Sequence, residues 1–349
     1  MNMKTNNKKH VNIPVFIPHL GCPNQCVFCN QRSISGTSSF SEDDAAMIIE
    51  DTLSTLRGSG KKCEIAFFGG SFTGIDRALM VRLLDLAEEY VKRGDVVGIR
   101  MSTRPDYISP EIIGILSGYT VTQVELGIQS MNRGVLSACK RGHTPEDTVK
   151  ACGLLKNAGF SFVGQMMIGL PTATQTDETE CAEKICAMGA DAARVYPTVV
   201  FRDTELEKDT ESGIYKPLMV DEAVERTKNV LEVFDAHGVN VIRIGLCDNE
   251  SLHSDETYVA GPNHGAIGEM ARSAVFYDVM TAMLEQAVRD GKQLYGKKVL
   301  FSVPCGATSM AVGHKRANSE KIKNNYGVKC VEILENPSLV RYNIKMEIM

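Results

Sequence analysis

A repeat of short apolar runs separated by helical segments constrains the fold of this chain more than any other feature. Most of the runs are apolar at nearly every position, which is typical of strands buried on both faces of a parallel sheet. The segments between them have helical apolar spacing, with capping residues at their ends. The runs cover 12–18, 63–70, 96–102, 120–129, 160–169 and 192–200, and the helical segments cover 41–57, 76–94, 144–159 and 177–190.

Six strand–helix units of roughly thirty residues predict an α/β fold built on a parallel (β/α) barrel. A complete barrel or a partial, six-stranded barrel would both satisfy the repeat. A further helix is expected over 219–238, a strand over 240–246 and a long helix over 268–291. We therefore divide the chain into a flexible basic tail (1–11), a barrel domain (12–246), a helical extension (247–291) and a small basic α+β module (292–349).

The cysteine usage and the apolar content limit the class of protein. Eleven cysteines, an odd number, are spread along 349 residues, which excludes a small secreted disulfide framework. Hydrophobic residues make up 43% of the chain, yet no apolar stretch is long enough to span a membrane. We therefore expect a protein without membrane contact, in the reducing cytoplasm.

Three cysteines follow the first apolar run in the stretch LGCPNQCVFCNQRSISG. Cys22, Cys26 and Cys29 have C-x3-C-x2-C spacing, which suits three irons of a four-iron, four-sulfur cluster and leaves the fourth iron for an exchangeable ligand. His19 offers an alternative, since it would complete a His-Cys-Cys-Cys zinc site. The loop alone does not decide between an iron–sulfur cluster and a zinc site.

Several motifs, taken in order, carry a resemblance to a known family. The cysteine loop, with Phe28 before its third cysteine, resembles the radical S-adenosylmethionine (SAM) superfamily. Further motifs resemble the radical SAM domain of the Elongator catalytic subunit and its bacterial relatives, and more distantly oxygen-independent coproporphyrinogen oxidase. These motifs are FFGGSFTG (67–74), STRPDYI (102–108), VELGIQS (124–130), KRGHT (140–144), GQMMIGLP (164–171) and YPTVVFRDTEL (196–206).

The resemblance implies a partial barrel of the radical SAM type, a 4Fe-4S cluster and SAM as cofactors. It implies that SAM chelates the open iron. One electron from a reductant such as flavodoxin or ferredoxin would then cleave SAM to a 5'-deoxyadenosyl radical, which abstracts hydrogen from a substrate. The cofactors supply this chemistry, and the protein supplies orientation and protection.

The resemblance also assigns residues to SAM. Glycines let a ligand approach the backbone closely, and the planar guanidinium of Arg141 suits the SAM carboxylate. Gln129 would contact the ribose, whereas Ser102 stands where the family often has Glu. An ordinary turn at the glycines and a solvated charge at Arg141 are the alternatives. The expected SAM contacts are Phe28, Gly69, Gly70, Ser102, Gln129 and Arg141.

Four polar residues are candidates for substrate binding or catalysis. Glu125 faces into the barrel, either as a brace for a neighbouring Arg or as a catalytic group. Gln165 interrupts an apolar run, which indicates a ligand-facing amide. Tyr196 either lines the substrate pocket or packs in the barrel, and Arg202 matches the Elongator-type pattern.

The segment 292–329 carries eight Lys or Arg and one Glu, a net charge of +7. Since the whole chain carries −5, the rest carries about −12, and this asymmetry suggests a polyanionic partner. The order strand, helix, GHKR loop, helix, strand resembles a KH-type RNA-binding fold, although Arg316 replaces the second glycine of the G-x-x-G loop. A solvated lysine-rich cap is the alternative. The candidate RNA contacts are His314, Lys315, Arg316, Lys321 and Lys323.

Three functions fit these observations. The first is a radical SAM enzyme acting on RNA, with a base of transfer RNA (tRNA) as its substrate. The second is a radical SAM enzyme acting on a small molecule such as a tetrapyrrole. The third is a non-enzymatic, zinc-bearing RNA-binding protein.

Overall fold

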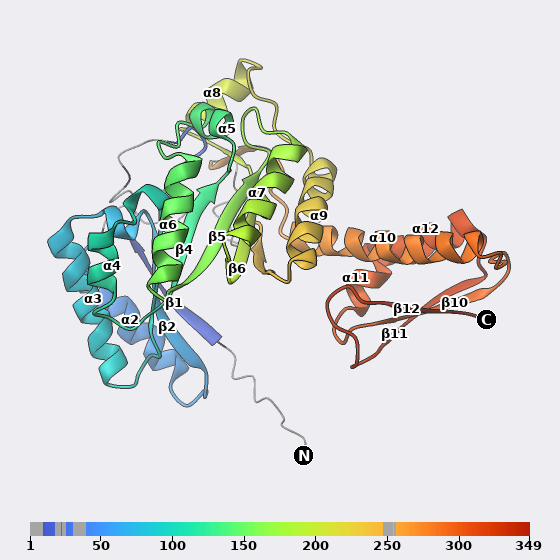
Figure 1. The fold of residues 1–349 in the computed structure, drawn as a ribbon, viewed down its shortest axis with the longest axis horizontal. Coiled ribbons are helices and arrows are strands. Elements are labelled where there is room, and N and C mark those ends of the chain that lie inside the picture. Colours follow the sequence, from blue (N-terminus) through green and yellow to red (C-terminus); the bar gives the residue numbers. More distant parts are fainter. Residues whose placement is uncertain (1–9, 18–21, 23–25, 31–39, 247–253, 255) are drawn as a thin grey trace.

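The computed structural model describes residues 10–17, 22, 26–30, 40–246, 254 and 256–349. Its centre is a parallel sheet of seven strands, in the order β1-β2-β3-β4-β5-β6-β8 (Figure 1). The sheet thus has one strand more than six, because the expected run 240–246 joins its edge beside β6. The strands are β1 (His10–Ile17), β2 (Lys62–Gly69), β3 (Ile99–Thr103), β4 (Val121–Gln129), β5 (Ser161–Ile168), β6 (Ala192–Pro197) and β8 (Asn240–Ile244).

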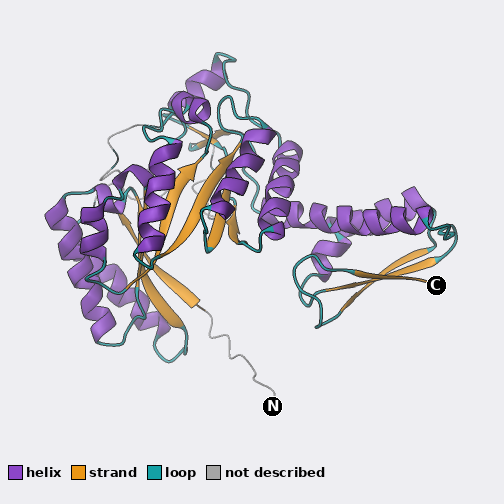
Figure 2. Cartoon of the chain, in the orientation of Figure 1, coloured by secondary structure: helices purple, strands orange, loops and turns teal. Residues whose placement is uncertain are grey.

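Helices connect these strands and cover the outer face of the half-barrel (Figure 2). Ser41, Thr144 and Thr174 each cap a helix through a capping box, which satisfies free backbone N–H groups at the helix start. The short helices α4, α5 and α8 were not expected from the sequence. The helices are α2 (Glu42–Leu56), α3 (Arg77–Lys92), α4 (Pro110–Leu116), α5 (Arg133–Ala138), α6 (Pro145–Asn157), α7 (Gln175–Ala187), α8 (Glu205–Glu211) and α9 (Val220–Ala236).

The two faces of the sheet differ in chemistry. On β4, the side chains of Val124, Leu126 and Ile128 are fully buried in the main core under the helices. Successive strand residues point to opposite faces, so Glu125 points to the concave inner face. This inner face is polar on several strands, and it is the surface on which a ligand inside the half-barrel would rest.

The expected strand 192–200 is two elements. β6 ends at Pro197, and the chain continues into a separate strand, β7 (Val200–Phe201), which pairs antiparallel with β9 (Tyr258–Ala260). Proline has no N–H for the ladder, which accounts for the end of the parallel strand at that residue.

The C-terminal part forms an arm that α10 (Ile267–Arg289) connects to the barrel (Figure 1). β10 lies at the centre of its three-stranded sheet, parallel to β11 and antiparallel to β12, and two helices pack on one side. Among the described residues, no helix has the length and apolar content needed to cross a bilayer. The elements after α10 are β10 (Lys298–Val303), α11 (Thr308–Val312), the 3-10 turn η4 (His314–Arg316), α12 (Ala317–Tyr326), β11 (Cys330–Glu335) and β12 (Lys345–Ile348).

Candidate cofactor site

The cysteine loop follows β1 at the carboxyl edge of the sheet. Cys26 is buried, whereas Cys22 and Cys29 are half-buried. The Cys29 N–H donates to the carbonyl oxygen of Cys26 at 2.9 Å, so these two residues lie in one tight turn. The alternative zinc ligand, His19, lies outside the described residues.

Val27 anchors this turn to the rest of the barrel. Its N–H donates to the carbonyl oxygen of Cys139 at 3.2 Å, at the end of α5, and its carbonyl oxygen accepts from the N–H of Leu206 at 2.8 Å, in α8. Its side chain is buried in an apolar cluster with Leu170 and Tyr215. Two of the unexpected short helices therefore hold the cysteine turn in place.

Two polar side chains contact the cysteine sulfurs. Ser71 Oγ lies 3.2 Å from Cys22 Sγ. Arg141 Nη1 lies 3.5 Å from Cys26 Sγ, and its Nη2 donates to the carbonyl oxygen of Gly127 at 2.8 Å. Arg141 is buried, so the alternative of a solvated charge at this position is wrong.

The thiols are the ligand type that an iron–sulfur cluster requires. In the part of the chain that the structure describes, no three Cys, His, Asp or Glu side chains already lie close enough together to hold a metal ion. The surroundings nevertheless fit an added polar group, because several buried polar atoms beside the turn have no hydrogen-bond partner among the described residues. These atoms are Arg104 Nη1, Gln129 Oε1 and Arg141 Nε.

Gln129 has an unusual backbone and an unsatisfied side chain. Its φ is +64°, and the register between β4 and β5 shifts at this point, as in a β-bulge. The side chain is only 6% exposed, yet its Oε1 accepts no hydrogen bond from the residues that the structure describes. Buried acceptors usually have a donor, so Gln129 fits a ligand hydroxyl or amino group.

Gly69, the last residue of β2, is required by the packing of the sheet itself. Gly69 has a φ of +102°, and a Cβ there would lie 3.2 Å from the backbone nitrogen and oxygen of Ile17. Glycine is therefore required at Gly69 by the approach of β1, whatever ligand lies near Gly70. The stacked rings of Phe67 and Phe72, 4.5 Å apart, fix the turn that follows.

Arg104 and His143 are buried polar residues near the site that the sequence analysis did not assign to it. Arg104 is 1% exposed, and its guanidinium donates two 2.9 Å hydrogen bonds to Asp106 within the same turn. Burial, with the nearby Arg141, lowers the pKa of His143 to about 4, so its imidazole is neutral near pH 7. Both residues lie in turns, outside the helices and strands. Burial can be predicted from a helical or strand pattern of apolar residues, and a turn has no such pattern.

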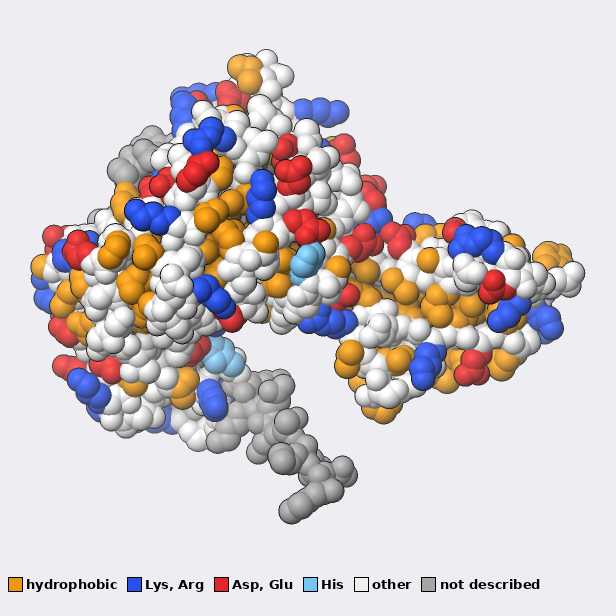
Figure 3. Space-filling view, in the orientation of Figure 1, with side chains coloured by type: hydrophobic (Ala, Val, Ile, Leu, Met, Phe, Trp, Pro, Cys, Tyr) orange, Lys and Arg blue, Asp and Glu red, His pale blue; other side chains and the backbone are white. Residues whose placement is uncertain are grey.

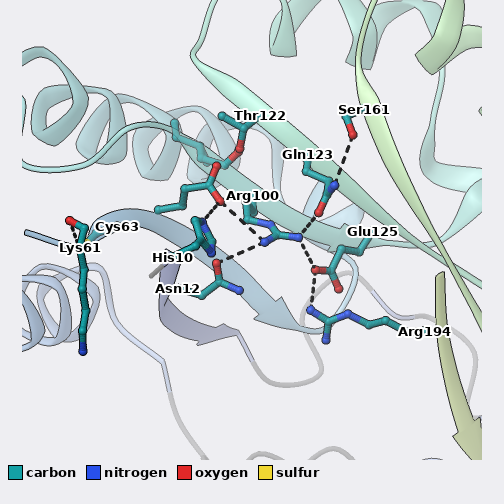
Figure 4. A network of polar contacts seen from close by, with 12 residues as sticks. His10, Asn12, Lys61, Cys63, Arg100, Thr122, Gln123, Glu125, Ser161 and Arg194 are labelled. Carbon is teal, nitrogen blue, oxygen red and sulfur yellow. Dashed lines mark hydrogen bonds and ion pairs between the residues drawn. The ribbon is translucent and has the colours of Figure 1, made fainter. Parts of the chain in front are cut away.

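Glu125 lies in a buried network of charges on the inner face (Figure 4). Its Oε1 accepts from Arg194 at 2.8 Å and from Arg100 at 3.3 Å. Arg100 also contacts Gln123, and its Nη1 lies 3.7 Å from Glu64. Burial raises the pKa of Glu125, and the two guanidinium groups oppose that rise. These contacts are those of a brace for neighbouring arginines, one of the two roles anticipated for Glu125.

The other candidate residues for substrate binding lie in two places, on the inner face of the sheet and near the cysteine loop. Gln165 and Tyr196 are half-buried on the inner face, where the Tyr196 hydroxyl lies 3.2 Å from Arg194 Nη1. Arg202 is exposed near the cysteine loop, since its carbonyl oxygen accepts from Asn30 Nδ2 at 2.9 Å and its guanidinium pairs with Glu207. Ser102 is half-buried near the end of β3, in register with Glu125.

Two family models match the chain. The Radical SAM superfamily model matches residues 16–185, and the Radical_SAM C-terminal domain model matches residues 190–275. Together the matches span the cysteine loop, the sheet from the end of β1 to β8, and part of α10.

Known relatives support the same family. An uncharacterised protein of Methanocaldococcus jannaschii is 28% identical over 64% of this chain and 72% of its own length. The tRNA uridine(34) acetyltransferase of the same organism is 36% identical over 37% of this chain, and Elongator complex protein 3 of Danio rerio is 32% identical over 42% of it. This chain spans only 24% and 27% of the lengths of the last two proteins.

A solved structure shares the fold. Elp3 of Methanocaldococcus infernus superposes with a TM-score of 0.61 and 23% identity, over 79% of this chain and 63% of the other. The Elongator resemblance and the barrel of the radical SAM type are confirmed. The chain therefore belongs to the radical SAM superfamily: it is a radical SAM enzyme, and its cofactors are a 4Fe-4S cluster and S-adenosylmethionine.

Proposed function

We propose that this radical SAM enzyme acts on a base of tRNA. The observation that carries the proposal is the basic C-terminal segment 292–329, with a net charge of +7 on a chain whose remainder carries about −12. The names of two relatives, a tRNA uridine(34) acetyltransferase and Elongator complex protein 3, point to the same class of substrate. The chain spans about a quarter of the length of those two proteins.

The cysteine turn and its neighbours are proposed to hold the cofactors. Cys22, Cys26 and Cys29 would ligate three irons of the cluster. Arg141 would bind the SAM carboxylate, because its guanidinium lies beside Cys26 and its Nε has no protein partner. Gln129 would accept a hydrogen bond from the SAM ribose. When bound, the cofactors supply a 5'-deoxyadenosyl radical that removes a hydrogen atom from the substrate.

The surrounding residues protect and orient the site. Val27 and the helices α5 and α8 keep the cysteine turn at the edge of the sheet, and the inner face below it supplies polar side chains for the substrate. A small protein reductant such as flavodoxin or ferredoxin is proposed to deliver the electron. Phe28, Gly70 and Ser102 complete the proposed SAM contacts.

The C-terminal module is proposed to bind the RNA backbone, as a KH-type fold does. Between α11 and α12, Lys315 and Arg316 both have left-handed backbone conformations, and both side chains are exposed beside His314. Figure 3 shows Lys and Arg side chains on the visible face of this arm. Lys321 and Lys323, exposed on α12, would extend the same contact.

The first experiment tests the radical chemistry. The protein is purified without oxygen, iron and sulfide are measured, and 5'-deoxyadenosine is quantified after reduction with SAM present. We expect a brown protein that forms 5'-deoxyadenosine, and loss of both properties in Cys26→Ser. Cys305→Ser, which changes an exposed cysteine in the distant arm, is the matched control. One zinc and no iron would contradict the enzyme and favour the zinc-bearing RNA-binding protein.

The second experiment tests the substrate. Binding of tRNA is measured against salt concentration for the wild type, Lys315→Gln and Lys150→Gln. Removing one phosphate contact reduces the salt slope by about 1, so we expect this change in Lys315→Gln but not in Lys150→Gln, an exposed control on α6. Mass spectrometry of tRNA from cells with and without the protein then identifies the base. Absence of tRNA binding at low salt would favour a small-molecule substrate.

A further inference from the structure

A cavity lies where the C-terminal module meets the barrel. Its volume is about 280 Å³, and its lining comes from α9, β8, α10, the turn after β10, α11 and the loop before β12. Figure 1 shows α11 beneath the barrel end of α10, close to this junction. Sites for small molecules begin at about 300 Å³, so the cavity has the size for a small organic molecule.

The walls of the cavity are mostly apolar, as in other small-molecule sites. Leu231 and Val241 pack in the core of the barrel, whereas Phe276 and Ala307 pack in the core of the C-terminal module. A molecule in the cavity would therefore contact both cores. The apolar lining residues used here are Leu231, Val241, Phe276, Pro304, Ala307 and Met310.

Tyr342 brings a buried hydroxyl group to this cavity. Its ring packs edge-on against Phe276, with the ring centroids 5.0 Å apart. The hydroxyl oxygen is buried and forms no hydrogen bond with the residues that the structure describes. Burial raises the pKa of this hydroxyl, and the nearby Arg272 guanidinium opposes the rise, although the two groups do not meet in hydrogen-bond geometry. Buried hydroxyls usually have a partner, so Tyr342 fits a ligand that accepts a hydrogen bond.

Arg272 supplies a positive charge beside this hydroxyl. Its Nη2 donates to the carbonyl oxygen of Val241 at 2.8 Å, and it forms no salt bridge within the described part of the chain. The carboxylate that lines the cavity, Asp235, pairs instead with Arg341 at 3.3 Å. Two arginines and one aspartate leave a net charge of +1 on the described lining, and it lies at Arg272. Glu232 of α9 is exposed and is not one of the described lining residues.

We propose that this cavity binds a small organic anion. Arg272 and the Tyr342 hydroxyl would hold its carboxylate or phosphate group, and its apolar body would lie against Val241 and Phe276. A guanidinium binds such oxyanions through charge-assisted hydrogen bonds. The proposal goes beyond the proposed function, because it does not depend on the substrate of the radical SAM site. A ligand here would stabilise the contact between the barrel and the C-terminal module, since it contacts both.

The cavity lies at the opposite edge of the sheet from the candidate cofactor site. Val241 is the second residue of β8 and pairs in parallel with Ala193, the second residue of β6. The cavity is therefore at the amino edge of the strands, whereas the cysteine turn follows the carboxyl end of β1. The described residues that line the cavity include none of the candidate SAM contacts.

The test is isothermal titration calorimetry on the full-length protein, purified without oxygen. The probes are benzoate and phenyl phosphate, with benzyl alcohol as an uncharged probe of similar shape, at matched ionic strength. We expect at least one of the two anions to bind the wild type more tightly than benzyl alcohol does. A ligand that bridges the two cores should also slow hydrogen exchange in α11 and in the first turns of α10.

Two substitutions place the probe in the cavity. Tyr342→Phe removes only the hydroxyl, so anion binding should weaken about three- to tenfold. The urea midpoint without the probe should stay unchanged, because the hydroxyl has no hydrogen bond to lose among the described residues. Arg272→Gln should weaken binding about tenfold, and Arg272→Lys should recover part of the affinity. Arg289→Gln, at the far end of the same helix, is the matched control and should bind as the wild type does.

The outcomes separate the sources of the anionic group. Binding of phenyl phosphate alone supports a phosphate ester, and binding of benzoate alone supports a carboxylate. Binding of neither anion, or wild-type affinity in Tyr342→Phe or Arg272→Gln, overturns the proposal. Loss of probe binding when SAM is added also overturns it, because the probe would then occupy the cofactor contacts. Failure of the proposed function would appear instead as no 5'-deoxyadenosine or no tRNA binding, with anion binding intact.

Discussion

Arg141 joins the cysteine turn to the end of β4, because one guanidinium nitrogen lies 3.5 Å from Cys26 Sγ and the other donates to Gly127 at 2.8 Å. A Cβ on Gly127 would lie 2.8 Å from Arg141 Nη2. Gly127→Ala should therefore displace this guanidinium and weaken SAM binding about tenfold, measured by calorimetry on the cluster-loaded protein. Gly114→Ala, where a Cβ meets nothing within 4 Å, is the control; unchanged SAM affinity in Gly127→Ala would argue against the role of Arg141.

A substitution at Gln129 should weaken SAM binding without changing the stability of the protein. Gln129→Asn shortens the side chain, and Asn tolerates the left-handed backbone that this position requires. We expect SAM affinity to fall about three- to tenfold. The urea midpoint without SAM should stay unchanged, because Oε1 has no protein partner to lose. A lower midpoint with unaltered SAM affinity would show a structural role.

His143 should make stability depend on pH. Its native pKa of about 4 lies below the ordinary value near 6.5, so the unfolded state takes up a proton that the native state does not. The free energy of unfolding should therefore fall as the pH drops from 6.5 to 4, by up to about 3 kcal/mol. Urea unfolding of the wild type and His143→Gln across this range measures the effect; parallel curves would contradict it.

Asn318 should hold the turn between α11 and α12 in place. Its buried Nδ2 lies within hydrogen-bond distance of Ser273 on α10 and of the carbonyl oxygens of Met310 and Ala311. Asn318→Ala should destabilise the protein by about 1–3 kcal/mol, because buried acceptors lose their donor. Hydrogen exchange should become faster in α11 and α12. Asn324→Ala, on the exposed side of α12, should change neither quantity.

The barrel could be predicted from the sequence because each unit carries agreeing local signals. Thr144, for example, caps its helix, and Pro145 occupies the first turn, and both residue types are typical of these positions. The short helices α5 and α8 could not be predicted, since six or seven residues are too few to show a helical period. Their stability comes from the cysteine turn that packs between them.

The site was only partly predictable for a similar reason. The order of the motifs along the chain was enough to predict that the cysteines, Gln129 and Arg141 lie at one edge of the sheet. The ion pair between Glu125 and Arg194 joins β4 and β6, two strands that are not neighbours in the sheet, and no local pattern encodes such a contact. The burial of Arg104 likewise depends on tertiary packing around a turn.

The long helix α10 belongs to two cores at once. Ile267, Ala271 and Val275 pack into the core of the barrel, and Phe276, Met280 and Leu284 pack into the core of the C-terminal module. With 23 residues, the helix is about 35 Å long. Because α10 packs into both cores, its length sets the distance between the barrel and the C-terminal module. A molecule that contacted both the turn His314–Arg316 and the cysteine turn would therefore be selected by its length as well as by its chemistry.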